Sequence, residues 1–196
     1  MLKEDIIDFI YTNNVFQLGT KKFKNGDFSD HSYDFGKIGS GKDLMQLGML
    51  INNIVNDSDF NVIFTSAYNS ILIATALLFD CNLCFPSEMI KLGIVKKEKK
   101  INKDSSLFLG YKPVKGDKVL LFNDVFTTGE SLVEMNNLIK STGAKVTSAF
   151  IIVNQSSDDQ FKKIQNTLDF PIKFLISDKE IVNLFDVYFK KSSAAC

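Results

Sequence analysis

The sequence predicts an α/β protein with a doubly wound, mostly parallel sheet and a small N-terminal cap. From Asn61 onward, short apolar runs alternate with helical patterns, an arrangement typical of a parallel sheet with helices on both faces. The chain has 196 residues, 45% of them hydrophobic, which is enough for one proper core. We therefore expect a single domain, with an N-terminal helix and cap over about residues 1–35 and an α/β core over about residues 60–190.

The N-terminal part differs in pattern from the core. Apolar residues recur at helical spacing over residues 2–12, which predicts an amphipathic helix. Residues 15–35 then alternate short apolar and polar pieces around the turn Asn25-Gly26-Asp27. This second pattern predicts a small β-rich cap that is separate from the main sheet.

Residues 36–43 nearly match the nucleotide-binding P-loop motif G-x-x-x-x-G-K-[ST]. Asp43 occupies the place of the hydroxyl that would bind magnesium, and no strong apolar strand precedes the segment. A carboxylate at that point would repel the phosphates that the loop should bind. We therefore interpret the segment as a glycine-rich turn into a helix over residues 43–55.

The remaining segments predict the alternating strands and helices of the core. The expected strands comprise residues 61–65, about 90–95, 119–122, 144–153 and 170–176. The expected helices comprise residues 70–79, 131–141, 158–167 and 179–189. Residues 190–196 are expected to form a frayed tail.

One strand–turn–helix unit, residues 119–131, has the composition of a phosphate site. Its apolar strand is expected to end at Asn123-Asp124 and to pass through Thr127-Thr128-Gly129 into the next helix. In open α/β sheets, ligands bind beyond the carboxyl ends of the strands, and free N–H groups at a helix start favour an anion. We expect Asp124 at the rim beside that anion. The unit suits a ligand with a phosphate on one side and hydroxyls or a metal ion on the other, such as a ribose 5-phosphate.

This unit resembles the phosphoribosyl-diphosphate (PRPP) signature of type I phosphoribosyltransferases. In that signature an apolar strand, two acidic residues and two apolar residues precede Thr-Thr/Ala-Gly-Thr-Ser/Ala. Here Asn123 occupies the place of the first acid and Glu130 that of the second-last threonine. An ordinary turn between a strand and a helix is the alternative. The resemblance implies a type I phosphoribosyltransferase fold and a PRPP site made by Asn123, Asp124, Thr127, Thr128, Gly129, Glu130 and Ser131.

Residues 65–70 resemble the pyrophosphate loop of the same family, commonly Gly-Pro-Ala-Tyr-Lys-Gly. Tyr68 matches the pattern, whereas Asn69 replaces the lysine and Ser70 the last glycine. Asn69 cannot bring positive charge to a pyrophosphate, and serine adopts a left-handed or closely packed backbone less readily than glycine. The resemblance implies that Tyr68 and Asn69 contact PRPP.

Residues 96–106 resemble the mobile catalytic loop of orotate phosphoribosyltransferases, Arg-Lys-Glu-x-Lys-x-His-Gly, although a solvated charged loop is the alternative. Lys97 and Lys100 match, Lys96 replaces the arginine and Asn102 replaces the histidine. The resemblance implies that these four residues contact the pyrophosphate of PRPP. It also implies that Lys97 and Lys100 act in catalysis together with Asp124.

A third group of residues resembles the base pocket of orotate phosphoribosyltransferases. Lys24 keeps the lysine of the N-terminal pattern Gly-x-Phe-Thr-Leu-Lys-Ser-Gly, although a solvated surface lysine is the alternative. Tyr33 falls where the family has an aromatic residue near the pyrimidine, and Ser32 replaces another. Gln155 falls where the family has an arginine that reaches the base. The resemblance implies that Lys24, Tyr33 and Gln155 bind the base.

Taken together, these resemblances imply transfer of the phosphoribosyl group of PRPP to orotate, giving orotidine 5′-phosphate and pyrophosphate in pyrimidine nucleotide synthesis. They also imply Mg²⁺ carried by the PRPP diphosphate, without protein ligands that the sequence identifies, and a homodimer whose loops complete each other's sites. Four departures keep two alternatives open, namely a weak or silent PRPP- or nucleotide-binding paralogue and a phosphoribosyltransferase for another base. The departures are Asn69, Asn102, Glu130 and Asn154-Gln155.

The composition argues against several other classes. The net charge is zero and the lysines are interspersed with acidic residues, so we expect no nucleic-acid or membrane partner. No apolar run can span a bilayer, residues 1–5 are too acidic for a signal peptide, and the three cysteines fit a reducing compartment; we expect a cytoplasmic protein. With His31 as the single histidine, Cys81-Asn-Leu-Cys84 lacks the further ligands of a closed zinc site. The chain contains no arginine, so lysines or backbone N–H groups must bind any anion.

Overall fold

The core is a six-stranded sheet with the strand order β5-β4-β3-β6-β7-β8. The computed structural model describes residues 3–23, 26–66, 68–84, 89–96 and 107–184. Its core strands are β3 (Val62–Thr65), β4 (Lys91–Val95), β5 (Phe108–Gly110), β6 (Lys118–Phe126), β7 (Lys145–Asn154) and β8 (Ile172–Ser177). Neighbouring strands are parallel except β4 and β5, which are antiparallel. The predicted doubly wound, mostly parallel sheet is confirmed.

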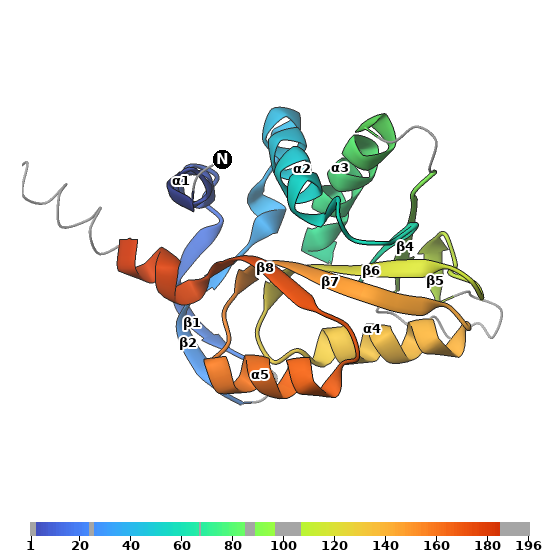
Figure 1. Cartoon of the computed structure of the whole chain (residues 1–196). Helices are drawn as coiled ribbons and strands as arrows, with labels where there is room; N and C mark the ends of the chain where they lie inside the picture. The colour runs from blue at the N-terminus through green and yellow to red at the C-terminus, as the bar shows by residue number, and fades with distance from the viewer. Residues whose placement is uncertain (1–2, 24–25, 67, 85–88, 97–106, 185–196) are drawn as a thin grey trace, which may run out of the picture.

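Helices cover both faces of this sheet (Figure 1). One face carries α1 (Lys3–Thr12), α2 (Gly41–Val55) and α3 (Tyr68–Cys84), and the other carries α4 (Glu130–Ser141) and α5 (Asp158–Thr167). Successive side chains of a strand point to opposite faces, so the strands supply two separate cores. Ile63, Leu120 and Phe122 pack beneath α1, α2 and α3. Phe64 and Leu121 belong to the second core, with α4 and α5.

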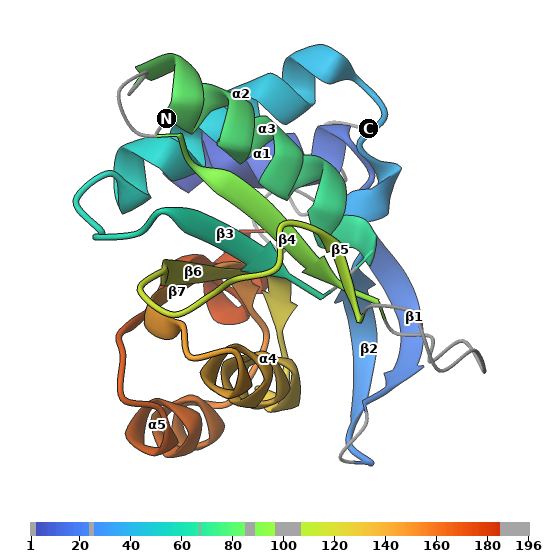
Figure 2. The same cartoon turned by 90° about the vertical axis from the view of Figure 1, so that its right-hand side faces the viewer.

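The predicted cap is an antiparallel hairpin of β1 (Phe16–Lys22) and β2 (Phe28–Tyr33), which forms a sheet of its own. Figures 1 and 2 show that the hairpin extends from the core toward the side of the sheet that carries α4 and α5. A short 3-10 helix, η1 (Phe35–Lys37), connects it to α2. The hairpin thus lies outside the main sheet, as its alternating pattern predicts.

Several element boundaries differ from the prediction. Helix α2 begins at Gly41 and not at Asp43, because Ser40 is its N-cap and accepts a hydrogen bond from the Asp43 backbone N–H. Helix α3 is longer at both ends than residues 70–79. Strand β5 was not predicted. A helix after β8 begins at residue 178 and is described to residue 184, and the rest of the predicted segment 179–196 lies outside the described residues.

Strand β6 shows the difference with the largest consequence for the site. It continues to Phe126 instead of ending at the polar pair Asn123-Asp124, because Asn123, Val125 and Phe126 all pair in register with β7. Asp124 therefore lies inside the strand, two residues before its end, and not at the rim.

No helix in the described part of the chain is both long and apolar enough to cross a membrane.

Candidate active site

Two strand–turn–helix units lie side by side at the carboxyl edge of the sheet. Strands β3 and β6 are parallel neighbours, and the chain passes from β3 into α3 and from β6 into α4. Strand β4 flanks β3 and β7 flanks β6, so the order of the chain reverses between β3 and β6. Ligands of open α/β sheets bind at such a reversal. The PRPP signature and the pyrophosphate loop, which the sequence places far apart, thus meet at one edge.

The turn from β6 into α4 needs a glycine, for both its backbone conformation and its close packing. Gly129 is the N-cap of α4 and has a φ of 80°, a left-handed conformation that glycine adopts readily. A Cβ at this position would lie 2.7 Å from Ile164 Cγ1 and 2.9 Å from Phe126 Cζ. Gly129 has no side chain to cap the helix, and the Glu130 backbone N–H makes only a long bond of 3.5 Å to Thr128 Oγ1. The N–H groups of Leu132 and Val133 donate to the Gly129 carbonyl oxygen. A helix start that is capped this weakly favours an anion.

Neighbouring residues hold this turn in place. Thr128 is buried, and its carbonyl oxygen accepts a hydrogen bond of 2.6 Å from Gln160 Nε2 of α5. Thr127 and Ser131 are half-buried, whereas Glu130 is exposed in the first turn of α4. A carboxylate there interacts favourably with the positive end of the helix dipole. The residues of the predicted phosphate turn therefore lie together, and the bond to Gln160 joins the turn to α5.

Asp124, near the end of β6, is buried and is hydrogen-bonded to α3. Only 7% of the residue is exposed. The Ser70 hydroxyl donates to Asp124 Oδ1 at 2.9 Å, and the Asp124 backbone N–H donates to Ser70 Oγ at 2.9 Å. The neighbouring Asn123 is 5% exposed, and its Oδ1 has no hydrogen-bond partner among the described residues.

The first turn of α3 also contacts the segment that follows the cap. Asn69 Nδ2 donates to Asp34 Oδ1 at 2.9 Å, and the same oxygen accepts from the Gly36 backbone N–H at 3.1 Å. Tyr68 begins the helix and is 64% exposed. The Asn69 amide is thus engaged with the protein, while the Tyr68 ring faces solvent at the edge of the candidate site.

The described residues of the predicted base pocket bind the cap to the core. Gln155 Nε2 donates to the His31 carbonyl oxygen at 3.1 Å and to Ser29 Oγ at 3.3 Å. Tyr33 is 3% exposed and its hydroxyl donates to Asp178 Oδ1 at 2.7 Å; burial, with that hydrogen bond, raises its pKa. Both side chains support the cap, and their contact with a base stays a prediction. Lys24 lies outside the described residues.

The predicted catalytic loop begins and ends at the same edge of the sheet as the two turns. Lys96 follows β4, and its backbone N–H donates to the Leu107 carbonyl oxygen at 2.9 Å, which joins the two described ends of the loop. The Lys96 side chain is exposed. Lys97, Lys100 and Asn102 lie outside the described residues, so their roles stay predictions.

Comparison with known proteins assigns the chain to a family. No protein-family model matches the sequence. The orotate phosphoribosyltransferase of Haemophilus influenzae is 31% identical over 163 residues, covering 78% of this chain and 71% of the relative. That of Ruthia magnifica is 29% identical over 185 residues, covering 93% of this chain and 85% of the relative. The chain belongs to the orotate phosphoribosyltransferase family.

Solved structures agree with this family at the level of the fold. The orotate phosphoribosyltransferase of Francisella tularensis has a TM-score of 0.68 at 22% identity, covering 95% of this chain and 98% of that chain. The Mycobacterium tuberculosis orotate phosphoribosyltransferase in complex with PRPP has a TM-score of 0.66 at 16% identity, covering 92% and 93%. Leishmania donovani UMP synthase has a TM-score of 0.76 at 20% identity, covering 97% of this chain and 38% of that chain.

Beside the residues matched to this family, the structure identifies a charged cluster that sequence reasoning missed. His31 of the cap lies between two carboxylates, with Nε2 2.6 Å from Asp178 Oδ1 and Nδ1 2.6 Å from Asp30 Oδ1. The Phe16 ring stacks on the imidazole at 5.1 Å. Burial opposes the charge of His31, but the hydrogen bonds to Asp178 and Asp30 outweigh it and raise the pKa. The sequence separation of His31 and Asp178 is 147, and no local signal could have linked them.

Proposed function

We propose that the protein is an orotate phosphoribosyltransferase, which transfers the phosphoribosyl group of PRPP to orotate and releases pyrophosphate in pyrimidine nucleotide synthesis. The observation that carries the proposal is the start of α4 at the glycine N-cap Gly129, which follows the buried carboxylate of Asp124 by five residues in the same strand–turn–helix unit. An anion-binding turn and a fixed carboxylate match the phosphate and the hydroxyls of a phosphorylated ribose. The named relatives support the choice of reaction.

Each part of the site would meet one part of the reaction. The turn formed by Thr127, Thr128, Gly129, Glu130 and Ser131 would hold the ribose phosphate through backbone N–H groups. Asp124 would hold the ribose hydroxyls while positive charge develops at C1 of the sugar. Lys96, Lys97 and Lys100, together with Tyr68, Asn69 and Asn102, would lie on the side of the departing pyrophosphate.

We further propose that Mg²⁺ accompanies the PRPP diphosphate. This ion favours oxygen ligands, keeps several waters and usually binds through substrate phosphates with one or two carboxylates. Asp124 is a buried carboxylate two residues before the carboxyl end of β6. Bound there, the ion would neutralise charge that accumulates on the leaving diphosphate. We also propose a cytoplasmic location, which the free thiols of Cys81 and Cys84 support.

Binding and turnover experiments separate this function from the two alternatives. Asp124→Asn should weaken PRPP·Mg²⁺ binding at least about tenfold by calorimetry, because a charge-assisted hydrogen bond is lost. Asp117→Asn is the matched control, since Asp117 is also a buried aspartate but precedes β6, at its other end. It should lower stability and leave PRPP affinity unchanged. Unchanged affinity in Asp124→Asn would remove Asp124 from the site.

Pyrophosphate release is then measured with a panel of bases. Release with orotate supports the proposed reaction, and release only with another base supports a different phosphoribosyltransferase. PRPP binding without release with any base would support the silent paralogue. If PRPP itself does not bind, the proposed function is wrong.

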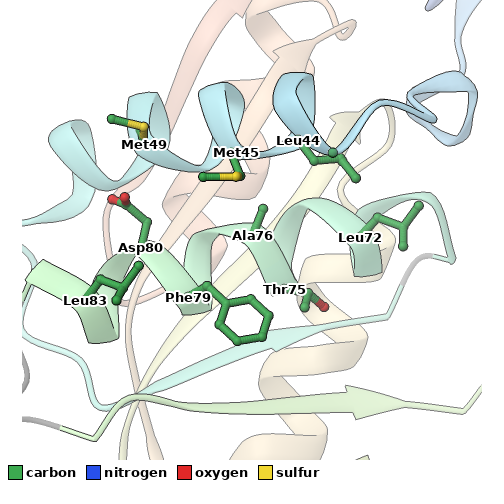
Figure 3. Close-up of a pocket in the computed structure, with 10 residues that line it drawn as sticks. Leu44, Met45, Met49, Leu72, Thr75, Ala76, Phe79, Asp80 and Leu83 are labelled. Carbon is green, nitrogen blue, oxygen red and sulfur yellow. The ribbon is translucent and has the colours of Figure 1, made fainter.

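We propose that the protein is a twofold homodimer, and the face of α2 and α3 supports this proposal. A groove of about 470 Å³ lies between the two helices, lined by Met45 and Met49 of α2 and by Leu72, Phe79 and Leu83 of α3, which Figure 3 labels. On α3, Phe79 is 65% and Leu83 77% exposed, and Asp80 is the one charged residue among the helix's 17. Such a continuous apolar face is typical of a protein–protein contact. A self-complementary contact on a twofold axis is the commonest form in homo-oligomers.

Two measurements test the dimer and the sharing of loops. Phe79→Glu should convert the dimer to a monomer in analytical ultracentrifugation, because it places a charge in an apolar contact. If the loops complete each other's sites, mixing Lys100→Ala with Asp124→Ala protein should restore part of the activity through hybrid dimers. A monomeric wild-type protein would contradict the dimer. Absence of restored activity between subunits shown to exchange would contradict the shared loop.

A further inference from the structure

We propose that Ser70 is a positioning residue that fixes the orientation of the Asp124 carboxylate for the ribose of PRPP. This inference rests on the proposed function. One serine hydroxyl both donates to Asp124 Oδ1 and accepts from the backbone N–H of the same residue, each at 2.9 Å. Ser70 is fully buried, so both bonds are shielded from solvent.

The paired bonds determine where the carboxylate points. Donation from Ser70 fixes Oδ1, and the bond from the Asp124 N–H fixes the hydroxyl relative to the strand. The two bonds therefore limit rotation of the Asp124 side chain. A carboxylate that is oriented before substrate arrives needs no rearrangement when charge develops on the sugar.

The hydroxyl is itself held in place by the packing of α3. Ser70 lies in the first turn of this helix, and Ile73, Ala74 and Leu77 on the following turns are fully buried against the sheet. The first turn is tied on its other side by the hydrogen bond between Asn69 and Asp34. Ser70 is therefore a fixed donor and not an adaptable surface hydroxyl.

This arrangement gives a physical reason for a departure from the family pattern. The sequence resemblance aligns Ser70 with a glycine, which has no side chain to bind the carboxylate. Here the serine joins two elements that lie 54 positions apart in the chain. It connects the turn on the pyrophosphate side with the carboxylate on the ribose side.

The experiment compares Ser70→Ala with a matched control, Ser148→Ala. Ser148 is also a buried serine, on β7, but its Oγ has no hydrogen-bond partner among the described residues. We expect Ser70→Ala to weaken PRPP binding roughly tenfold, the size of one hydrogen bond to a charged group. Binding of inorganic pyrophosphate should stay unchanged, because it has no ribose. Ser148→Ala should change neither affinity.

A double-mutant cycle distinguishes positioning from a general loss of structure. If Ser70 acts through Asp124, Ser70→Ala should have no further effect on PRPP affinity in an Asp124→Asn background. An equal loss in both backgrounds, or an equal loss of pyrophosphate binding, would show a merely structural role and overturn the proposal. If wild-type protein binds PRPP and Ser70→Ala binds it equally well, Ser70 is not a positioning residue. Failure of wild-type protein to bind PRPP would instead refute the proposed function.

Discussion

The two turns at the carboxyl edge of the sheet present different chemical groups to the site. The turn from β6 into α4 has a glycine at the N-cap, which carries no capping side chain and allows close packing against α5. In the turn from β3 into α3, Asn69 and Ser70 bind Asp34 and Asp124 instead. The first turn can therefore meet a ligand with its backbone. The second shapes the site through bonds within the protein, and this happens where the chain departs from the family pattern.

The largest effect is expected from Gly129→Ala, which changes the backbone conformation of the turn from β6 into α4. The new methyl group would meet Ile164 and Phe126 within 3 Å, and the residue would keep an unfavourable positive φ. Overpacking and strain together should cost roughly 2–4 kcal/mol of unfolding free energy. We also expect PRPP affinity to fall more than about tenfold, because the helix start moves.

Gly116→Ala is the control for this change. Gly116 also has a positive φ, 98°, but a Cβ there would meet nothing within 4 Å. It should therefore lose only about 1 kcal/mol from backbone strain, without any change in PRPP affinity. Similar losses of unfolding free energy in both variants would show that backbone strain alone, and not close packing of the turn, accounts for the cost of Gly129→Ala. Urea unfolding and calorimetry provide the two measurements.

A smaller effect is expected from restoring the family lysine at Asn69. From the sequence alone, Asn69→Lys with Asn102→His is expected to raise turnover with orotate at least about tenfold, by adding charge near the leaving pyrophosphate. The structure changes this expectation for Asn69, because Asp34 lies at hydrogen-bond distance and would pair with the new ammonium group. We now predict that Asn69→Lys alone raises turnover less than about threefold. Combined with Asp34→Asn, it should reach about tenfold.

Asp34→Asn alone is the control, because asparagine can still accept the hydrogen bond from the Gly36 N–H. Turnover is followed by steady-state release of pyrophosphate, with orotate saturating. If Asn69→Lys is as fast with Asp34 present as without it, Asp34 does not hold the lysine. The turn from β3 into α3 could then present charge to the ligand, and the contrast drawn above between the two turns would be wrong.

The parts of the fold set by local pattern could be predicted from the sequence. The apolar strands, the amphipathic helices and the order of strand, polar pair and Thr-Thr-Gly turn in residues 119–131 are all read within about a dozen positions. The end of β6 was missed because pairing with β7 extends the strand through polar residues. Tertiary pairing overrides the local preference of Asn123 and Asp124 in that case.

Contacts between distant segments could not be predicted in the same way. Ser70 looked like an unfavourable replacement of glycine, and its bond to Asp124 is visible only when α3 packs on β6. Asn69 looked like a missing charge, whereas Asp34 gives it a partner within the protein. The sequence marks these positions as departures from the family pattern, but their side-chain partners come from packing.

The smallest predicted effect is on the stability of the contact between the cap and the core. Like the turn from β3 into α3, this contact depends on side-chain hydrogen bonds within the protein. His31 contacts Asp30 on its own strand, Asp178 after β8 and the ring of Tyr33, and Tyr11 lies near Asp178. Its raised pKa means that the folded protein holds the proton more tightly than the unfolded chain. The stabilisation is complete below the unfolded pKa of about 6.5 and is lost as pH rises through the folded value.

We therefore predict that the free energy of unfolding of wild-type protein falls as pH rises above about 6.5, by no more than about 1 kcal/mol for the partly exposed pair of His31 and Asp178. His31→Gln keeps a polar side chain but cannot titrate, so its unfolding free energy should lack this decrease. Urea unfolding of both proteins at half-unit intervals from pH 5.5 to pH 9 measures the difference, and subtraction removes titrations that the two share. Tyr33 and Tyr11 do not interfere, because their pKa values are raised above this range. Equal pH slopes in the two proteins would show that the cap is held by its apolar contacts and by Gln155, and that the charge of His31 contributes nothing.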